Sequence, residues 1–143
     1  SYLKEKWYRK VELGTSRPFL KDGVLRYKRK WGGRQISCTS EADGAYYIEP
    51  LTNTPGLKAF LINNPFIFVD KQKINGAVFV NSNDSLSQES LEEIYKHYYF
   101  DGMCKLFIYQ FGENSYRTQK MLPLEFSDRI RLCPADTLFQ KHH

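Results

Sequence analysis

The sequence predicts a mixed α/β fold of the α+β class, in which a mainly antiparallel sheet is covered by two to three helices. Two expected hairpins carry this prediction, 34–39 with 45–51 and 66–70 with 74–81, each joined by turn-forming or polar residues. Hairpins require antiparallel pairing, and helices that are apolar on one side need a sheet face to cover. A chain of 143 residues suits a single domain, 1–143.

The first part of this domain, 1–51, is predicted to run from a strand over 7–13 through a loop into a short basic helix over 22–31, followed by the first hairpin. Asp22 is placed to cap that helix, and the glycine pair Gly32-Gly33 is placed to end it. Three apolar side chains recur at i, i+3 and i+7 on one helical face: Val24, Tyr27 and Trp31. We therefore expect this face to pack on the core.

The second part, 52–143, is predicted to contain a helix, the second hairpin and a βαβ-like extension. Thr54 caps a short helix that begins at Pro55 and ends before Pro65, with an apolar face made by Leu57, Phe60 and Leu61. Ser85 or Ser87 caps a helix over 87–99 whose apolar face is Leu91, Ile94, Tyr95 and Tyr98. The runs 105–111, 121–126 and 129–133 are predicted to be extended.

Positive charge is concentrated at the start of the chain. Residues 1–40 hold 11 Lys and Arg against 3 Asp and Glu, a balance of +8, so the remaining residues carry −3 of the net +5. Such a distribution favours an anionic partner such as a phosphate, a nucleotide, RNA or an acidic membrane surface, although solvated surface charge is the commoner explanation.

The cysteines and histidines indicate neither a disulfide framework nor a metal site. Cys38, Cys104 and Cys133 are widely spaced and odd in number, which is typical of reduced thiols in an intracellular protein, and we expect a cytoplasmic location. No Cys-x-x-Cys pair is present, and two of the three histidines end the chain. No apolar run reaches the 18 residues that typically mark a membrane-spanning helix.

Several chemically suggestive residues have ordinary structural explanations. Asp22 is interpreted as a helix cap rather than a catalytic acid, and Cys104 with His97 makes a weak case for a nucleophile pair. The aromatic residues at helical or strand spacing are interpreted as core residues rather than base-stacking ones: Tyr27, Trp31, Tyr95, Tyr98, Tyr109 and Phe111. The basic helix and the loop before it are the functional signal that remains.

Residues 11–32, V-E-L-G-T-S-R-P-F-L-K-D-G-V-L-R-Y-K-R-K-W-G, resemble the late strand-loop-helix of GNAT-fold acyltransferases, in particular the FemAB-like and CelD-like branch. Proteins of that branch carry a glycine and a small hydroxyl residue after a strand, and then an aromatic-Lys-x-Gly-Phe-Gly type helix end. The matching positions here are Gly14, Ser16, Tyr27, Lys28, Trp31 and Gly32. The resemblance covers about 30 residues, and Lys30 departs from it because the family has a small residue there.

The resemblance implies the C-terminal part of an acyl- or aminoacyl-transferase, a GNAT-like partial domain that binds the acceptor substrate through Lys28, Arg17, Ser16 and Gly14. It identifies no catalytic residue. It also implies an acyl-CoA or aminoacyl donor and an anionic small-molecule or cell-envelope acceptor. We expect Lys28 to reach a groove beside Ser16 and Arg17, whereas Arg29 should point toward solvent.

An alternative from a different functional class stays open. The Arg/Gln-x-x-Gly-x-Gly/Ala loop that holds the donor pyrophosphate in GNAT enzymes is not found in this sequence. The donor site is therefore expected to be missing, supplied by another chain, or located in a part of the protein that is not included. The alternative is a non-catalytic basic module that binds nucleic acid or another polyanion. Strand edges left open in a partial domain would also favour a homodimer.

Overall fold

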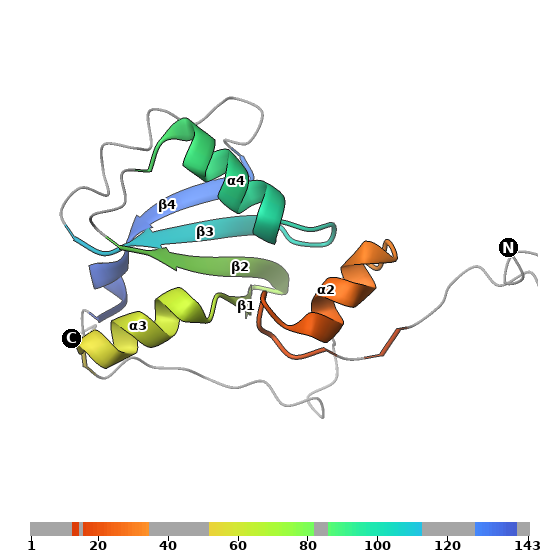
Figure 1. The fold of residues 1–143 in the computed structure, drawn as a ribbon, viewed down its shortest axis with the longest axis horizontal. Helices are drawn as coiled ribbons and strands as arrows, with labels where there is room; N and C mark the ends of the chain where they lie inside the picture. Colours follow the sequence, from red (N-terminus) through yellow and green to blue (C-terminus); the bar gives the residue numbers. More distant parts are fainter. Residues whose placement is uncertain (1–12, 15, 35–51, 82–85, 113–127, 140–143) are drawn as a thin grey trace, which may run out of the picture.

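The computed structural model describes residues 13–14, 16–34, 52–81, 86–112 and 128–139, which form a four-stranded mixed sheet with helices on both faces (Figure 1). The strand order is β1-β2-β3-β4. The strands are β1 (Phe66–Asp70), β2 (Lys73–Val80), β3 (Lys105–Gln110) and β4 (Ile130–Pro134). The helices are α2 (Gly23–Lys30), α3 (Pro55–Asn63), α4 (Gln88–Tyr98) and the short 3₁₀ helix η4 (Ala135–Phe139). The predicted α+β class is confirmed.

Strands β1 and β2 form the hairpin that the sequence predicts. They pair antiparallel from Phe66 with Ala77 to Asp70 with Lys73, so the turn consists of two residues, Lys71 and Gln72. Both turn residues have positive φ, 47° and 64°, the conformation required by a type I′ turn that follows the strand twist. The expected three-residue connection was one residue too long because Lys73 already belongs to β2.

The remaining pairings between the described strands are parallel, which differs from the expected mainly antiparallel sheet. Helix α4 returns the chain so that β3 lies parallel to β2, and β4 in turn lies parallel to β3. A hairpin turn reverses the chain, whereas a crossover helix restores its direction, and this accounts for the difference. The expected hairpin over 34–51, the strand over 7–13 and the run 121–126 lie outside the described residues.

The two faces of the sheet bury separate apolar clusters. On one face, α3 packs through Leu61 and Leu57 against Ala77, Phe79 and the aromatic residues near them. On the other face, α2 and α4 cover the opposite side chains of β2 and β3, and this cluster consists of Leu20, Leu25, Val78, Phe100, Met103 and Leu106, with Ile94 and Tyr98 packed against it. A third cluster beneath α4 consists of Leu86, Leu91, Ile108, Ile130 and Leu132.

The helix caps follow the sequence closely, because capping depends on neighbouring residues. The Thr54 side chain accepts a hydrogen bond from Leu57 N at 3.2 Å, and Ser87 Oγ accepts one from Ser90 N at 3.1 Å. The prediction is wrong for one apolar residue of α3: Phe60 is 52% exposed, whereas Leu61 is buried as expected. The face of α3 that packs on the core therefore comprises Leu57, Leu61 and Ile62 rather than the predicted Leu57, Phe60 and Leu61.

The chain enters α2 along the edge of β1. Leu20 N donates to Pro65 O at 2.8 Å, and Ile67 N donates to Pro18 O at 2.6 Å. Phe19 forms a bridge with Phe66, and Leu20 is almost completely buried. This short pairing fixes the point at which α2 begins and covers part of the free edge of β1.

Substitution of Gly76 in β2 tests how tightly the core is packed beneath α2 and α4. A Cβ at this position would lie 2.8 Å from both the Leu106 and the Met103 side chains. We expect Gly76→Ala to lower the free energy of unfolding by about 1–3 kcal/mol, the usual cost of overpacking a core. Urea denaturation would measure this change.

Gly56 supplies the matched control because it lies in the first turn of α3 and a Cβ there would meet no atom within 4 Å. Gly56→Ala should be neutral or stabilising by up to about 1 kcal/mol, since alanine favours the helix. Equal effects of the two substitutions would contradict the packing described for β2.

Candidate anion-binding groove

Helix α2 faces the core with a different side from the one expected. Val24, Tyr27 and Trp31 are 53%, 62% and 72% exposed, so the prediction that they pack on the core is wrong. Leu25 is the buried residue of this helix instead. The pairing of the preceding segment with β1 sets the rotation of α2, and tertiary attachment of this kind overrides the apolar pattern of a single turn or two.

Arg29 attaches α2 to the end of α4. Its guanidinium donates to Tyr99 O at 2.9 Å and to His97 O at 3.4 Å, and it lies 4.9 Å from the centre of the Phe100 ring. The expectation that Arg29 points toward solvent is therefore wrong. The last carbonyls of a helix have no partner within the helix and carry partial negative charge, which makes them good acceptors for an arginine.

The position of Arg29 has an electrostatic cost. Two effects lower the pKa of Arg29 from its ordinary value: partial burial has the larger effect, and the nearby positive charge of Arg26 has the smaller one. An arginine remains protonated at neutral pH even so, because its ordinary pKa is so high. The α2–α4 junction therefore carries a fixed positive charge.

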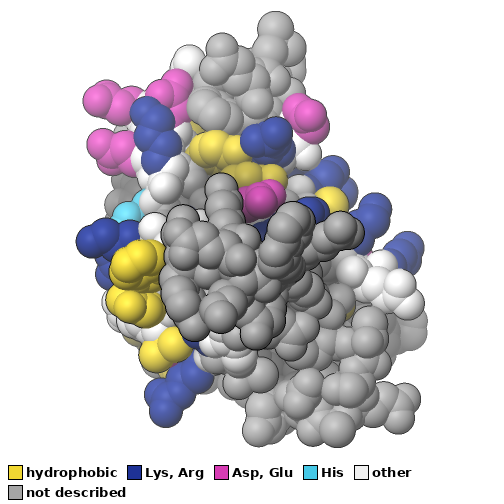
Figure 2. All heavy atoms as spheres, turned by 90° about the vertical axis from the view of Figure 1, so that its right-hand side faces the viewer, with side chains coloured by type: hydrophobic (Ala, Val, Ile, Leu, Met, Phe, Trp, Pro, Cys, Tyr) yellow, Lys and Arg dark blue, Asp and Glu magenta, His cyan; other side chains and the backbone are white. Residues whose placement is uncertain are grey.

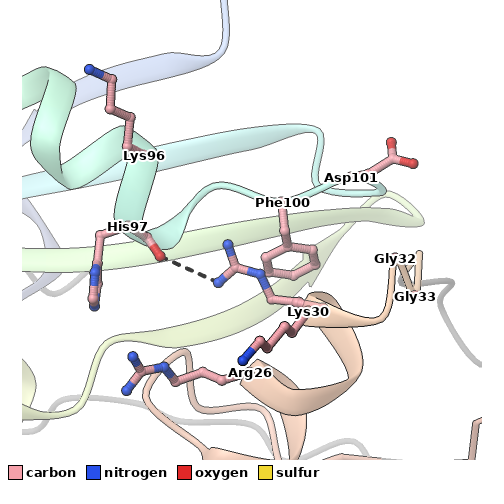
Figure 3. Close-up of a pocket in the computed structure, with 9 residues that line it drawn as sticks. Arg26, Lys30, Gly32, Gly33, Lys96, His97, Phe100 and Asp101 are labelled. Atoms are coloured by element: carbon pink, nitrogen blue, oxygen red, sulfur yellow. Dashed lines mark hydrogen bonds between the residues drawn. The ribbon is translucent and has the colours of Figure 1, made fainter.

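An open groove with a volume of about 560 Å³ lies at this junction (Figure 3). Its lining comes from both helices and from the segment that follows α4, and comprises Arg26, Arg29, Lys30, Gly32, Gly33, Lys96, His97, Phe100 and Asp101. Arg26 and Lys30 are exposed and stand one helical turn apart on α2. Figure 3 shows them projecting from α2 on the same side as the His97 and Phe100 side chains.

The charge of this lining is strongly positive. It contains four Arg and Lys side chains against one carboxylate, Asp101. Lys96 also lies 3.8 Å from Glu92 in an exposed ion pair, so its charge is partly compensated by a neighbour outside the groove. Arg26, Arg29 and Lys30 therefore dominate the potential at the groove, and such a potential attracts anions.

The end of α2 shapes one wall of the groove through its glycines. Gly32 has a φ of 75°, Gly32 N donates to Arg29 O, and Gly33 N donates to Lys28 O at 3.0 Å, which together make a Schellman cap. A Cβ on Gly33 would lie 2.9 Å from Lys28 O. The predicted helix end is thus confirmed, and so is the Asp22 cap, whose Oδ1 accepts a hydrogen bond from Leu25 N at 3.0 Å.

The residues that the acyltransferase resemblance selects lie in a separate place. Lys28 Nζ donates to Gly14 O at 2.9 Å, so the structure brings these two residues together. Ser16 is half-buried and Arg17 is exposed on the same loop. None of these four residues contributes to the groove lining that the structure describes.

Only part of the groove lining is predictable from the sequence. The sequence predicts the basic run 26–30, but nothing in the local pattern pairs this run with the groove residues about 70 positions away, which are Lys96, His97, Phe100 and Asp101. Among the described residues, no group of three or more His, Cys, Asp or Glu side chains could hold a metal ion. No helix within the described ranges is long and apolar enough to cross a membrane.

The attachment of α2 through Arg29 can be tested by stability. We expect Arg29→Gln to lower the free energy of unfolding by about 1.5–3 kcal/mol, because charge-assisted hydrogen bonds to two carbonyls are lost. Lys30→Gln is the control, since Lys30 is exposed on the same helix and should change stability by less than about 0.5 kcal/mol. Thermal or urea unfolding that ranks the two variants equally would contradict this attachment.

Comparisons of the chain with models of protein families, with curated proteins and with solved structures find no match.

Proposed function

We propose that this chain is a non-catalytic module that binds a phosphate-rich polyanion in the groove between α2 and α4. The observation that carries the proposal is the convergence of Arg26, Arg29 and Lys30 on one open groove whose lining holds a single carboxylate. Phosphate groups are recognised by such clusters because guanidinium and ammonium groups donate several hydrogen bonds to an anion.

The groove is partly organised before a ligand arrives. Arg29 is held by two backbone carbonyls and the Phe100 ring, so little of its side-chain entropy remains to be lost on binding. Arg26 and Lys30 are exposed and can adapt to successive charges of an extended ligand. One fixed cation flanked by two adaptable ones suits a chain of anions better than a single small anion.

The openness of the groove also favours a polymer over a small substrate. Small-molecule sites are usually enclosed and mainly apolar, so that most of the ligand is buried. This groove is a surface feature bordered by long charged side chains, and contacts of that kind position a ligand without covering it. Binding in such a groove should depend strongly on salt, because the released counterions contribute to affinity.

The paired substitution Arg26→Gln with Lys30→Gln tests this proposal directly. Each exposed contact should contribute about 0.7 kcal/mol, so affinity for inorganic polyphosphate should fall about tenfold. Fluorescence anisotropy with end-labelled polyphosphate at two salt concentrations would measure both the affinity and its salt dependence, which should be weaker in the variant.

The matched control removes the same charge from the opposite face of the sheet. Lys58 lies on α3. Arg131 in β4 is the register partner of Phe107 in β3, so its side chain lies on the sheet face that α3 covers. The double variant Lys58→Gln with Arg131→Gln should bind polyphosphate like the wild type. Equal losses in the two double variants would mean that net charge, rather than the groove, determines binding, and would overturn the proposal.

A second candidate function follows from the acyltransferase resemblance and from the contact between Lys28 and Gly14. In this proposal the loop at 14–17 and Lys28 bind the anionic acceptor of an acyl- or aminoacyl-transferase, and the donor is an acyl-CoA or an aminoacyl ester. The observation that favours it is the 2.9 Å hydrogen bond from Lys28 Nζ to Gly14 O, which joins the loop and the helix of the motif.

Release of free CoA from acetyl-CoA, with glutamate supplied as an anionic amine acceptor, would test this second candidate. If Lys28 contacts the acceptor, Lys28→Ala should reduce turnover by about tenfold, the effect of losing one charge-assisted hydrogen bond. Lys58→Ala should leave turnover unchanged. Wild-type protein that releases CoA no faster than buffer would count against transferase activity with this donor and acceptor.

A further inference from the structure

We propose that the polyanion is a single-stranded nucleic acid and that the exposed apolar face of α2 is a stacking platform for its bases. This face, the aromatic stripe, consists of Val24, Tyr27 and Trp31. The inference rests on the proposed function, because the groove supplies the phosphate contacts, and it adds the class of ligand.

The aromatic stripe is the most exposed apolar surface that the structure describes. Trp31 is 72% exposed and Tyr27 is 62% exposed, the two highest values among the large hydrophobic side chains in the described ranges. Their ring centres are 6.0 Å apart with the rings inclined at 60°, so the two rings contact each other at an edge and leave ring surface open to a ligand. Rings in this arrangement can each accept a base by stacking.

The aromatic stripe runs directly beside the cations of the groove. Arg26 and Lys30 each precede a ring, Tyr27 and Trp31, by one position, so the two pairs form parallel rows along the same helix. Figure 2 shows hydrophobic side chains bordered by Lys and Arg on this side of the molecule. A row of cations next to a row of rings matches the alternating phosphates and bases of one strand.

This juxtaposition selects one kind of polyanion. Inorganic polyphosphate has no apolar group to cover the rings, and in a duplex the base faces are already stacked on one another. A single strand presents charged phosphates and open base faces together, and base stacking on aromatic residues is tolerant of sequence. Anionic membranes offer another mixed surface, but membrane-bound helices have an extended apolar face. Helix α2 has eight residues, and this face consists of Val24, Tyr27 and the C-cap residue Trp31.

The fluorescence of Trp31 gives a direct readout of stacking. The chain has two tryptophans, so Trp7→Phe leaves Trp31 as the only one. Titration of this variant with a twelve-residue oligothymidylate at low salt should quench the tryptophan emission. Titration with inorganic polyphosphate should show binding by anisotropy without the same quenching.

Substitution separates the contribution of the rings from that of the cations. Trp31→Leu in the otherwise native chain should weaken binding of the oligonucleotide about tenfold, the effect of losing one stacked base, and should leave polyphosphate affinity unchanged. Phe60→Leu is the control, because Phe60 is an exposed ring on α3, and it should change neither affinity. Tyr27→Leu should act in the same direction as Trp31→Leu.

The outcomes distinguish this inference from the function on which it rests. If polyphosphate and oligonucleotide both bind but Trp31→Leu and Tyr27→Leu change neither affinity, the stacking platform is overturned while the polyanion groove stands. Failure of both ligands to bind overturns the groove and the platform together. Emission of Trp31 that responds to vesicles of anionic phospholipid and not to the oligonucleotide would assign the aromatic stripe to a membrane surface and overturn the inference.

Discussion

The hydrogen bonds from Arg29 to backbone carbonyls at the end of α4 are the interaction on which the proposed binding surface depends. They join two helices that are far apart in sequence, and they do so with a charged group placed over an aromatic ring. A partly buried charge without partners would be costly, but here the carbonyls replace the water that the Arg29 guanidinium loses. The α2–α4 junction is therefore held by hydrogen bonds and carries positive charge.

The direction in which α2 faces follows from this attachment together with the pairing of 18–20 along β1. Once Leu25 and Arg29 face the protein, the positions on the far side of the helix must face outward, and Tyr27 and Trp31 are among them. The same rotation places Arg26 and Lys30 between the groove and the aromatic stripe. The cations of the groove and the rings of the aromatic stripe are therefore neighbours because both positions follow from the same orientation of α2.

The helix caps and the β1–β2 hairpin of this chain are predictable from the sequence, whereas the way in which helices and strands are oriented relative to one another is not. The caps at Asp22, Thr54 and Ser87 depend on residues three positions away, and the hairpin of β1 and β2 depends on alternating strand residues and a short turn. These were recognised from the sequence. The balance of pairings differs from the expected mainly antiparallel sheet, because β3 pairs parallel with both β2 and β4, and the direction of a strand depends on where the preceding connection returns the chain.

The candidate site shows the same division between local and long-range information. The sequence predicts the basic run on α2, but it also predicts that the apolar residues of this helix are in the core, because an apolar helical face is usually buried. It predicts that Arg29 faces solvent because charged side chains usually do. Both predictions are wrong because no local pattern indicates that backbone carbonyls at the end of α4, those of His97 and Tyr99, accept hydrogen bonds from a neighbouring helix. Long-range contacts of this kind are what the sequence alone could not supply.

The most direct test of the account is to locate the bound polyanion on the folded protein by nuclear magnetic resonance. Backbone amide shifts recorded during titration with unlabelled polyphosphate should move most at α2 and at the end of α4, in the region of Arg26, Lys30 and His97. Amides of α3 around Lys58, on the other face of the sheet, should stay unchanged. Shifts that concentrate on α3, or that spread evenly over all exposed lysines and arginines, would contradict a binding groove at the α2–α4 junction.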